Sequence, residues 1–343
     1  MSDILLAKPK LPEGFIDLSV GEPHVVRETL RRVFNLSEIS RYCDEHVASL
    51  PSMYEYPNPS GYERLIKLLE DKYKAPVVIT NGAKQALGAC FYALNQLGMT
   101  KVGMRTPYWA LIPPLVKMHG LEPMTSYVGT NANLLIVPNN PDGFTSEPVL
   151  LQGFVDNCRS RGVPVIHDAA YYTPVYMPQD SILNALGDVQ IFSVSKMLGL
   201  SGLRIGFAVC YDQELYKLIQ QYMEAMTVGV SMLSQVFLYE LLYKMYSNQK
   251  LSENFEASSW LALNKSKLAF KQVHPDVLEV PDNFEDTAGM FGWFKVGPKA
   301  DFTKSKLNVI DGALFGVPGY VRINMAFDLD KVKEIVTRLN SVV

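Results

Sequence analysis

Cysteine is scarce in this sequence, with four residues among 343. They are Cys43, Cys90, Cys158 and Cys210, which lie far apart and form no CxxC pair. The five histidines also lack the spacing of metal ligands. This usage argues against a disulfide framework and against a structural zinc site, so we expect no metal. The simplest interpretation is a reduced, cytoplasmic protein whose thiols are buried.

An excess of one charge is also absent, because 32 basic residues face 35 acidic ones and the formal net charge is -3. Such a balance gives no electrostatic case for binding nucleic acid or an anionic membrane. No apolar run approaches the length that spans a bilayer, and the patch at residues 4–7 is too short for a signal peptide. A chain of 343 residues with 48% hydrophobic side chains favours a folded, soluble protein of two domains.

Glycine-rich nucleotide motifs are missing, since neither GxGxxG nor GxxxxGK[ST] occurs. A nicotinamide dehydrogenase therefore has no support. Short apolar runs instead alternate with amphipathic stretches. We expect strands at 76–80, 101–105, 133–138, 163–168, 189–195 and 203–210, and helices at 83–98, 110–120 and 146–162. This alternation predicts an α/β fold with a mostly parallel sheet covered by helices.

The last third of the chain has a different pattern. A long helical region at 212–247, interrupted near Gly229, precedes a helix at about 253–273, short strands and a final helix from about Asp328. We expect a smaller α+β domain that shares a long helix with the large one. The predicted organisation is an N-terminal segment at 1–40 that packs with the small domain, a large cofactor-binding domain at 41–225 and a small C-terminal domain at 226–343.

Ligands of parallel α/β sheets bind outside the carboxyl ends of the strands, and chemically useful residues gather at these positions. They are Gly82, Ala83 and Lys84 at a helix start, then Trp109, Asn140, Asp168 and Tyr171, and finally Ser193, Ser195, Lys196 and Arg204. Each has an ordinary alternative, such as a capped helix start, core packing, a tight turn or a surface lysine. Their coincidence at one edge of one sheet favours a site. His167 faces the other side of its strand and is expected to pack or to make a structural hydrogen bond.

One ligand uses all of these groups, namely pyridoxal 5'-phosphate, a flat ring that carries an aldehyde and a phosphate. Lys196 would form a Schiff base with the aldehyde, and Asp168 would keep the pyridine nitrogen protonated. Asn140 and Tyr171 would hydrogen-bond the ring hydroxyl oxygen, and Trp109 would stack on the ring. The phosphate would be held by Ser193, Ser195, Arg204 and the helix start at Gly82, Ala83 and Lys84.

The segments that carry these residues resemble the class I/II aminotransferases of fold-type I, which depend on pyridoxal phosphate. The matching segments are SVSKMLGLSGLRIG, PNNPDG, DAAY and NGAKQAL, and the resemblance extends over about residues 16–340. It implies the PLP-transferase type I fold and further assignments. Arg322 in VRIN would clamp the substrate α-carboxylate, with Asn140 and Gly21 of LSVGEP also at the substrate. Tyr56 in YPNPSG would reach the phosphate of a neighbouring subunit, which implies a homodimer.

The predicted function is therefore an aminotransferase that moves an amino group from an L-amino acid to a 2-oxo acid, with freed Lys196 removing the α-proton. A lyase or decarboxylase acting on an amino acid is the alternative, because the same residues stabilise the same carbanion. Asp142 stands where the family usually has threonine, as in the branch that resembles alliinase and plant tryptophan aminotransferases. A regulatory protein without the chemistry is disfavoured by the intact Lys196, Asp168 and Arg204.

Overall fold

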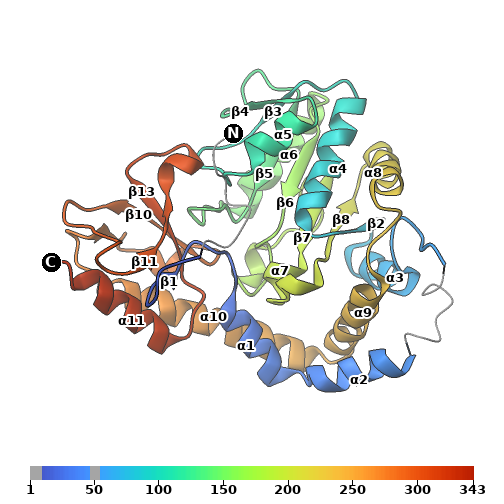
Figure 1. Ribbon diagram of the computed structural model, residues 1–343. Helices are drawn as coiled ribbons and strands as arrows, with labels where there is room; N and C mark the ends of the chain where they lie inside the picture. Colours follow the sequence, from blue (N-terminus) through green and yellow to red (C-terminus); the bar gives the residue numbers. More distant parts are fainter. Residues whose placement is uncertain (1–9, 47–54) are drawn as a thin grey trace.

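The structure is a computed structural model that describes residues 10–46 and 55–343. The apolar patch at 4–7 and the start of the predicted N-terminal segment lie outside the described residues. Figure 1 shows a large lobe built on one sheet and a smaller lobe that contains β10, β13 and α11. No described helix has the length and apolar character needed to cross a membrane.

The large sheet has seven strands in the order β2-β8-β7-β6-β5-β3-β4. They are β2 (Val77–Thr80), β3 (Lys101–Gly103), β4 (Glu122–Met124), β5 (Ala132–Ile136), β6 (Val165–Asp168), β7 (Val189–Ser193) and β8 (Gly206–Cys210). All pairs are parallel except the two that involve β8, which runs antiparallel to β2 and β7. The predicted, mostly parallel α/β sheet is confirmed, and its buried apolar strands fit a sheet covered on both faces.

The remaining strands build two small sheets. β9 (Leu278–Glu279), β10 (Phe291–Val296), β12 (Ile310–Asp311) and β13 (Tyr320–Asn324) form an antiparallel sheet in the order β12-β13-β10-β9. β1 (Ile16–Asp17) pairs in parallel with β11 (Leu307–Asn308). The backbone N–H of Asn324 also donates to the Leu18 carbonyl oxygen, so the chain near residue 18 lies beside the end of β13.

The helices predicted after residue 82 are present near their expected bounds, and those before residue 76 were not predicted. They are α1 (His24–Val33), α2 (Leu36–His46), α3 (Glu63–Tyr73), α4 (Ala83–Gln96), α5 (Ile112–Met118), α6 (Pro148–Ser160), α7 (Val194–Met197), α8 (Gln213–Met226), α9 (Met232–Ser247), α10 (Gln249–Phe270) and α11 (Leu329–Asn340). The predicted interruption near Gly229 is confirmed, because α8 ends at Met226 and α9 begins at Met232. Gly229 has a φ of 122°, which an L side chain rarely adopts.

Two hydrophobic cores match the two lobes. The first fills the large lobe, and the second joins Leu18 and Phe294 with α11. Helix α10 serves both, since Phe255 packs in the first core and Phe270 in the second. This agrees with the expectation of a shared long helix, and Figure 1 shows α10 running along both lobes. The predicted domain boundaries themselves stay a prediction.

The reversed direction of β8 decides where the polar residues meet. Register places Gly206, the first residue of β8, opposite Thr80 on β2 and Ser193 on β7. The start of β8 therefore lies at the same edge as the ends of its neighbours. Arg204, two residues before β8, arrives at the edge where β2 leads into α4 and β7 leads into α7.

Candidate active site

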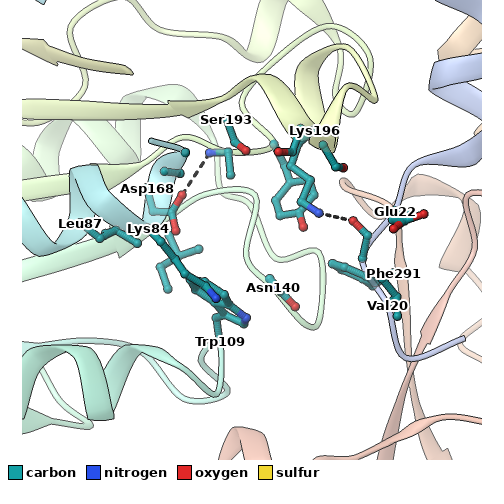
Figure 2. A pocket seen from close by; sticks show the side chains of 18 of the residues that line it. Val20, Glu22, Lys84, Leu87, Trp109, Asn140, Asp168, Ser193, Lys196 and Phe291 are labelled. Carbon is teal, nitrogen blue, oxygen red and sulfur yellow. Dashed lines mark hydrogen bonds between the residues drawn. The ribbon is translucent and has the colours of Figure 1, made fainter. Parts of the chain in front are cut away.

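A cavity of about 340 Å³ opens at this edge, between the large lobe, the small lobe and the segment at 20–22 (Figure 2). All predicted site residues except Tyr56 line it. They are Gly21, Gly82, Ala83, Lys84, Trp109, Asn140, Asp168, Tyr171, Ser193, Ser195, Lys196, Arg204 and Arg322. The structure thus brings together positions from residue 21 to residue 322 of the chain.

The start of α4 forms an anion-binding corner of the cavity. The first backbone N–H groups of a helix have no partner within the helix and attract negative charge. Glycine makes room for this corner, because a Cβ on Gly206 would lie 2.5 Å from the Ala83 nitrogen and a Cβ on Gly82 would lie 3.0 Å from Arg204 Nη2. Two cations flank the corner, and burial together with the charge of Arg204 lowers the pKa of Lys84.

Asp168 ends β6 at the floor of the cavity and is 6% exposed. Burial raises its pKa to about 6, against smaller lowering effects from the Ala170 N–H and from Lys196. The Ala170 N–H donates to Asp168 Oδ1 over 3.2 Å. Within the described chain no basic side chain pairs with Asp168 at 4.0 Å or less. A buried carboxylate in this state is costly, so the geometry calls for a cationic group in the cavity.

Lys196 lies in the short helix α7, directly after β7. Its Nζ donates to the Gly21 carbonyl oxygen. Figure 2 shows Lys196 across the cavity from Asp168. Burial, and then the charge of Arg322, lowers the pKa of Lys196 to about 8. The Tyr176 hydroxyl donates to the Lys196 carbonyl oxygen over 2.8 Å and so fixes the backbone of α7. The amine is therefore held in place, and it loses its proton at a lower pH than an ordinary lysine does.

Arg322 comes from β13 of the small lobe and is 5% exposed. Its Nη1 donates to Asn140 Oδ1 over 3.1 Å, and its Nη2 donates to the Ser19 carbonyl oxygen. Its guanidinium lies 4.1 Å from the Phe291 ring centroid, and its buried Nε has no partner among the described residues. Burial lowers its pKa to about 10, so the group remains cationic at neutral pH. A buried guanidinium with an unused donor suits an anionic ligand.

Asp142 secures the turn that carries Asn140. Its Oδ2 accepts from Arg105 Nη1 over 2.7 Å, and its Oδ1 accepts from Asn139 Nδ2 over 2.7 Å. Asn139 Nδ2 also donates to the Pro107 carbonyl oxygen over 2.9 Å. The acidic residue at this unusual position therefore ties the turn to the segment that follows β3, and it does not line the cavity.

His167 has the structural role that its strand position predicts. Its Nε2 donates to the Val137 carbonyl oxygen over 3.1 Å, and its Nδ1 accepts from Gln190 Nε2 over 3.1 Å. Burial lowers its pKa to about 4, so the ring is neutral.

Nowhere in residues 10–46 and 55–343 do three His, Cys, Asp or Glu side chains gather as metal ligands.

Sequence reasoning missed several residues of the cavity wall. They are Val20, Glu22, Leu87, Ile136, Ala170, Ser201 and Phe291. Most flank residues that the motifs singled out, so chain proximity was the available signal. Phe291 had none, because it starts β10 of the small lobe and reaches Arg322 only through the pairing of β10 with β13.

Tyr56 lies away from this cavity. Its side chain is 89% exposed, and it lines a separate surface hollow of about 330 Å³ with residues 227–233. Its predicted contact with the phosphate of a second subunit stays a prediction.

Comparison with known proteins identifies a matching family and several relatives of this chain. The family model described as allinase, the alliinase C-terminal domain, matches residues 69–343. Tryptophan aminotransferase-related protein 2 of Arabidopsis thaliana is 31% identical over 252 residues, which cover 68% of this chain but only 55% of the plant protein. Aspartate aminotransferase of Thermotoga maritima is 26% identical, with 96% of this chain and 92% of that protein covered. Among solved structures, aspartate aminotransferase from Thermus thermophilus with maleate matches with a TM-score of 0.79 at 17% identity, covering 96% of this chain and 92% of that one.

Proposed function

Because the chain belongs to the alliinase family, whose members and fold-type I aminotransferase relatives use pyridoxal 5'-phosphate, we propose that it is an aminotransferase acting between an L-amino acid and a 2-oxo acid. One observation carries this proposal. The half-buried amine of Lys196 and the buried carboxylate of Asp168, which has no basic partner in the described chain, share a cavity with an anion-binding helix start, the exposed Arg204 and the buried guanidinium of Arg322.

The cavity fits the cofactor on three counts. The unpaired Asp168 needs a cation, which the protonated pyridine nitrogen provides. The corner at Gly82, Ala83 and Arg204 needs an anion, which the phosphate provides. The amine of Lys196 lines the same cavity, where an aldehyde can reach it. When bound, pyridoxal phosphate supplies a ring that accepts the electron pair left on the substrate after its α-proton is removed.

The residues around the ring have distinct roles in this proposal. Asp168 would keep the ring nitrogen protonated. Asn140 and Tyr171 would hydrogen-bond the hydroxyl oxygen of the cofactor ring. Burial raises the pKa of Tyr171, so its hydroxyl stays protonated and able to donate. Trp109 covers the ring face, and Ser193 and Ser195 add to the phosphate corner together with Lys84.

Lys196 acts as the general base and acid. With its pKa lowered to about 8, a large share of the amine is neutral at slightly alkaline pH, so it can take the α-proton from the substrate carbon and return it to the cofactor's carbon. The Tyr176 hydroxyl holds the α7 backbone during both transfers. Gly21 supplies a carbonyl oxygen that holds the amine near the substrate position.

Arg322 receives the α-carboxylate of the substrate. Its contacts with Asn140 and Ser19 hold the guanidinium in place before the substrate arrives, which lowers the entropic cost of binding. Val20 and Phe291 add apolar surface near this charge, and Glu22 adds a carboxylate to the same wall. We therefore propose a donor with an apolar or aromatic side chain. The relatives are named for tryptophan and for aspartate, so both donors belong in the test.

The assembly and setting are part of the proposal. Tyr56 lies in an exposed hollow with Val228 and Leu233, an apolar surface that suits a second copy of the chain. A homodimer would let Tyr56 of one subunit reach the phosphate of the other. The four cysteines are free and buried, which supports a reducing, cytoplasmic setting.

The test follows the fate of the amino group. Purified protein loaded with pyridoxal phosphate is mixed with L-tryptophan, L-phenylalanine or L-aspartate, with and without 2-oxoglutarate. An aminotransferase releases about one 2-oxo acid per site without the acceptor and turns over only with it. Repeated product release without any acceptor would establish the lyase or decarboxylase instead.

The matched control is Lys196→Ala, which removes the proposed base. We expect it to bind the cofactor loosely and to lose turnover by at least about 10²-fold, the usual contribution of a positioned proton-transfer group. Normal turnover by this variant would refute the assignment of Lys196.

A further inference from the structure

A second cavity lies behind the helix that carries Lys196. It has a volume of about 160 Å³, and its wall includes Thr173, Phe192 and Met197. Met197 directly follows Lys196, and Thr173 is two residues beyond Tyr171. The active-site mechanism uses none of the residues that line this second cavity.

Two opposite charges border the second cavity without forming an ion pair. Lys72 projects from α3, and Glu256 projects from α10. Burial is the main cause of a lowered pKa for Lys72 and a raised pKa for Glu256, and each charge partly offsets this effect on the other. No ion pair of 4.0 Å or less joins these two described side chains. Lys72 Nζ instead lies 4.3 Å from the Tyr246 ring centroid.

A buried hydroxyl in the same wall is also unsatisfied. The Oγ1 of Thr173 has no hydrogen-bond partner, and the residue is only 8% exposed. An unpaired buried hydroxyl costs free energy unless a ligand or a water satisfies it. The wall of this cavity therefore combines an exposed cation and a half-buried carboxylate with a buried hydroxyl that has no partner among the described residues.

A larger hollow of about 610 Å³ adjoins this cavity and shares Pro174, Gln179 and Glu256 with it. Part of its wall is apolar, with Met177 and Trp260 beside Pro174. Glu256 thus stands between a polar inner chamber and an outer chamber with an aromatic wall. A ligand that fills both chambers has its charged end inside and an apolar side chain outside.

We propose that this double chamber is a binding site for a free amino acid with an apolar side chain, separate from the active site. The α-carboxylate of the ligand accepts from Lys72 and from the Thr173 hydroxyl. Its ammonium group donates to Glu256. Its side chain packs against Pro174, Met177 and Trp260. Binding of such an effector next to Met197 would stabilise the segment that carries Lys196.

Binding stoichiometry tests this site in the holoenzyme. The probe is radiolabelled L-α-methylphenylalanine, which has no α-proton to transfer, and its binding is measured by equilibrium dialysis. We expect two molecules per chain, one that changes the cofactor absorbance and one that does not. Lys72→Met and Glu256→Gln should each lower the affinity for the second molecule at least about tenfold, while the absorbance change caused by the first molecule persists. One molecule per chain in the unmodified enzyme, or a second one that ignores both substitutions, would overturn the proposal.

Two further variants separate recognition from general effects. Lys67→Met alters an exposed lysine on the same helix and should leave both molecules bound. Thr173→Val removes the unpaired hydroxyl, so it should raise stability without the probe and weaken the second molecule. Full binding by Thr173→Val, or weakened binding by Lys67→Met, would contradict the assigned contacts. The absorbance signal reports the active site separately, so failure of the proposed aminotransferase activity would not be confused with failure of this site.

Discussion

Asp168 shows the conflict between stability and function at a single residue. Its carboxylate is buried without a basic partner among the described residues, and burial raises its pKa from 3.8 to about 6. In the cofactor-free protein this is a cost. A ring cation would remove it, so the residue that destabilises the empty site favours the loaded one.

Replacement of Asp168 should expose this cost as a pH dependence. Well below pH 3.8, the ordinary pKa of the carboxyl, Asp168 is neutral in both the folded and the unfolded state, and Asp168→Asn should change stability little. As the pH rises through this range to above 6, the carboxyl ionises in the unfolded state before it does so in the folded state. The free energy of unfolding of the unmodified protein therefore falls, by roughly 3 kcal/mol in all. Urea unfolding of cofactor-free protein at pH 7.5 should therefore find Asp168→Asn more stable, although turnover falls by orders of magnitude.

The control for this prediction is Asp188→Asn. Asp188 accepts from Arg159 Nε over 3.0 Å and from the Val165 N–H over 2.8 Å. Loss of a carboxylate that already has partners should lower stability at pH 7.5. A destabilised Asp168→Asn at the same pH would show that Asp168 is satisfied by the protein itself.

Residue identities were the most predictable part of the site. Lys196, Asp168 and Arg204 stand out because strand ends of an α/β sheet converge, and the structure brings all three to one cavity. The structural role of Asp142 could not be predicted from the sequence, because its partner Arg105 is distant in the chain. Only the structure shows the hydrogen bond of 2.7 Å between them.

At the scale of elements, the phosphate corner depends on the close approach of β8 to α4. A Cβ on Gly206 would meet the Ala83 nitrogen at 2.5 Å and the Phe192 carbonyl oxygen at 2.8 Å. Both neighbours are backbone atoms, which cannot turn aside as a side chain can. The approach therefore requires glycine at this position.

Gly206→Ala should move the first turn of α4 and weaken cofactor binding by at least about tenfold, the scale of one lost charged hydrogen bond. Titration of the cofactor-free variant with pyridoxal phosphate, followed by absorbance, measures the effect. Gly202→Ala is the matched control, because a Cβ there meets no atom within 4 Å. Equal cofactor affinities for the two variants would show that the approach does not shape the phosphate site.

Some elements that the sequence analysis missed have weak patterns, but α1 and α3 are amphipathic helices that it did not single out. β4 has only three residues, Glu122–Met124, with a proline at its centre, and it lies at the sheet edge where proline is tolerated. The reversal of β8 was also not predicted, because an apolar run has the same pattern in either direction. The long periodic helix α4 was predicted nearly to both of its ends, and the start of α11 was predicted to within one residue.

At the scale of the whole molecule, the exposed apolar surface around Tyr56 suggests how two chains meet. Tyr56 is 89% exposed, Met226 60% and Leu233 52%, all near the break between α8 and α9. Such a cluster is unfavourable in water unless another surface covers it.

Leu233→Arg should therefore shift the protein from dimer to monomer in analytical ultracentrifugation and weaken cofactor retention, since Tyr56 would lose its place at the neighbouring phosphate. Leu261→Arg is a suitable comparison, because Leu261 is 55% exposed on α10 and does not line the hollow. A monomeric unmodified protein, or a dimer that survives Leu233→Arg, would contradict this interface.

The path of the chain through the cavity has a consequence for its synthesis. Ser19 and Gly21 contact Arg322 and Lys196, and Leu18 is hydrogen-bonded to Asn324. Ser19 and Arg322 are 303 residues apart in the chain, so the ribosome must add all of that length before these two residues can meet. Until then the nascent polypeptide has a lysine and an aspartate but no enclosed pocket, so vitamin B6 capture should be a post-translational event.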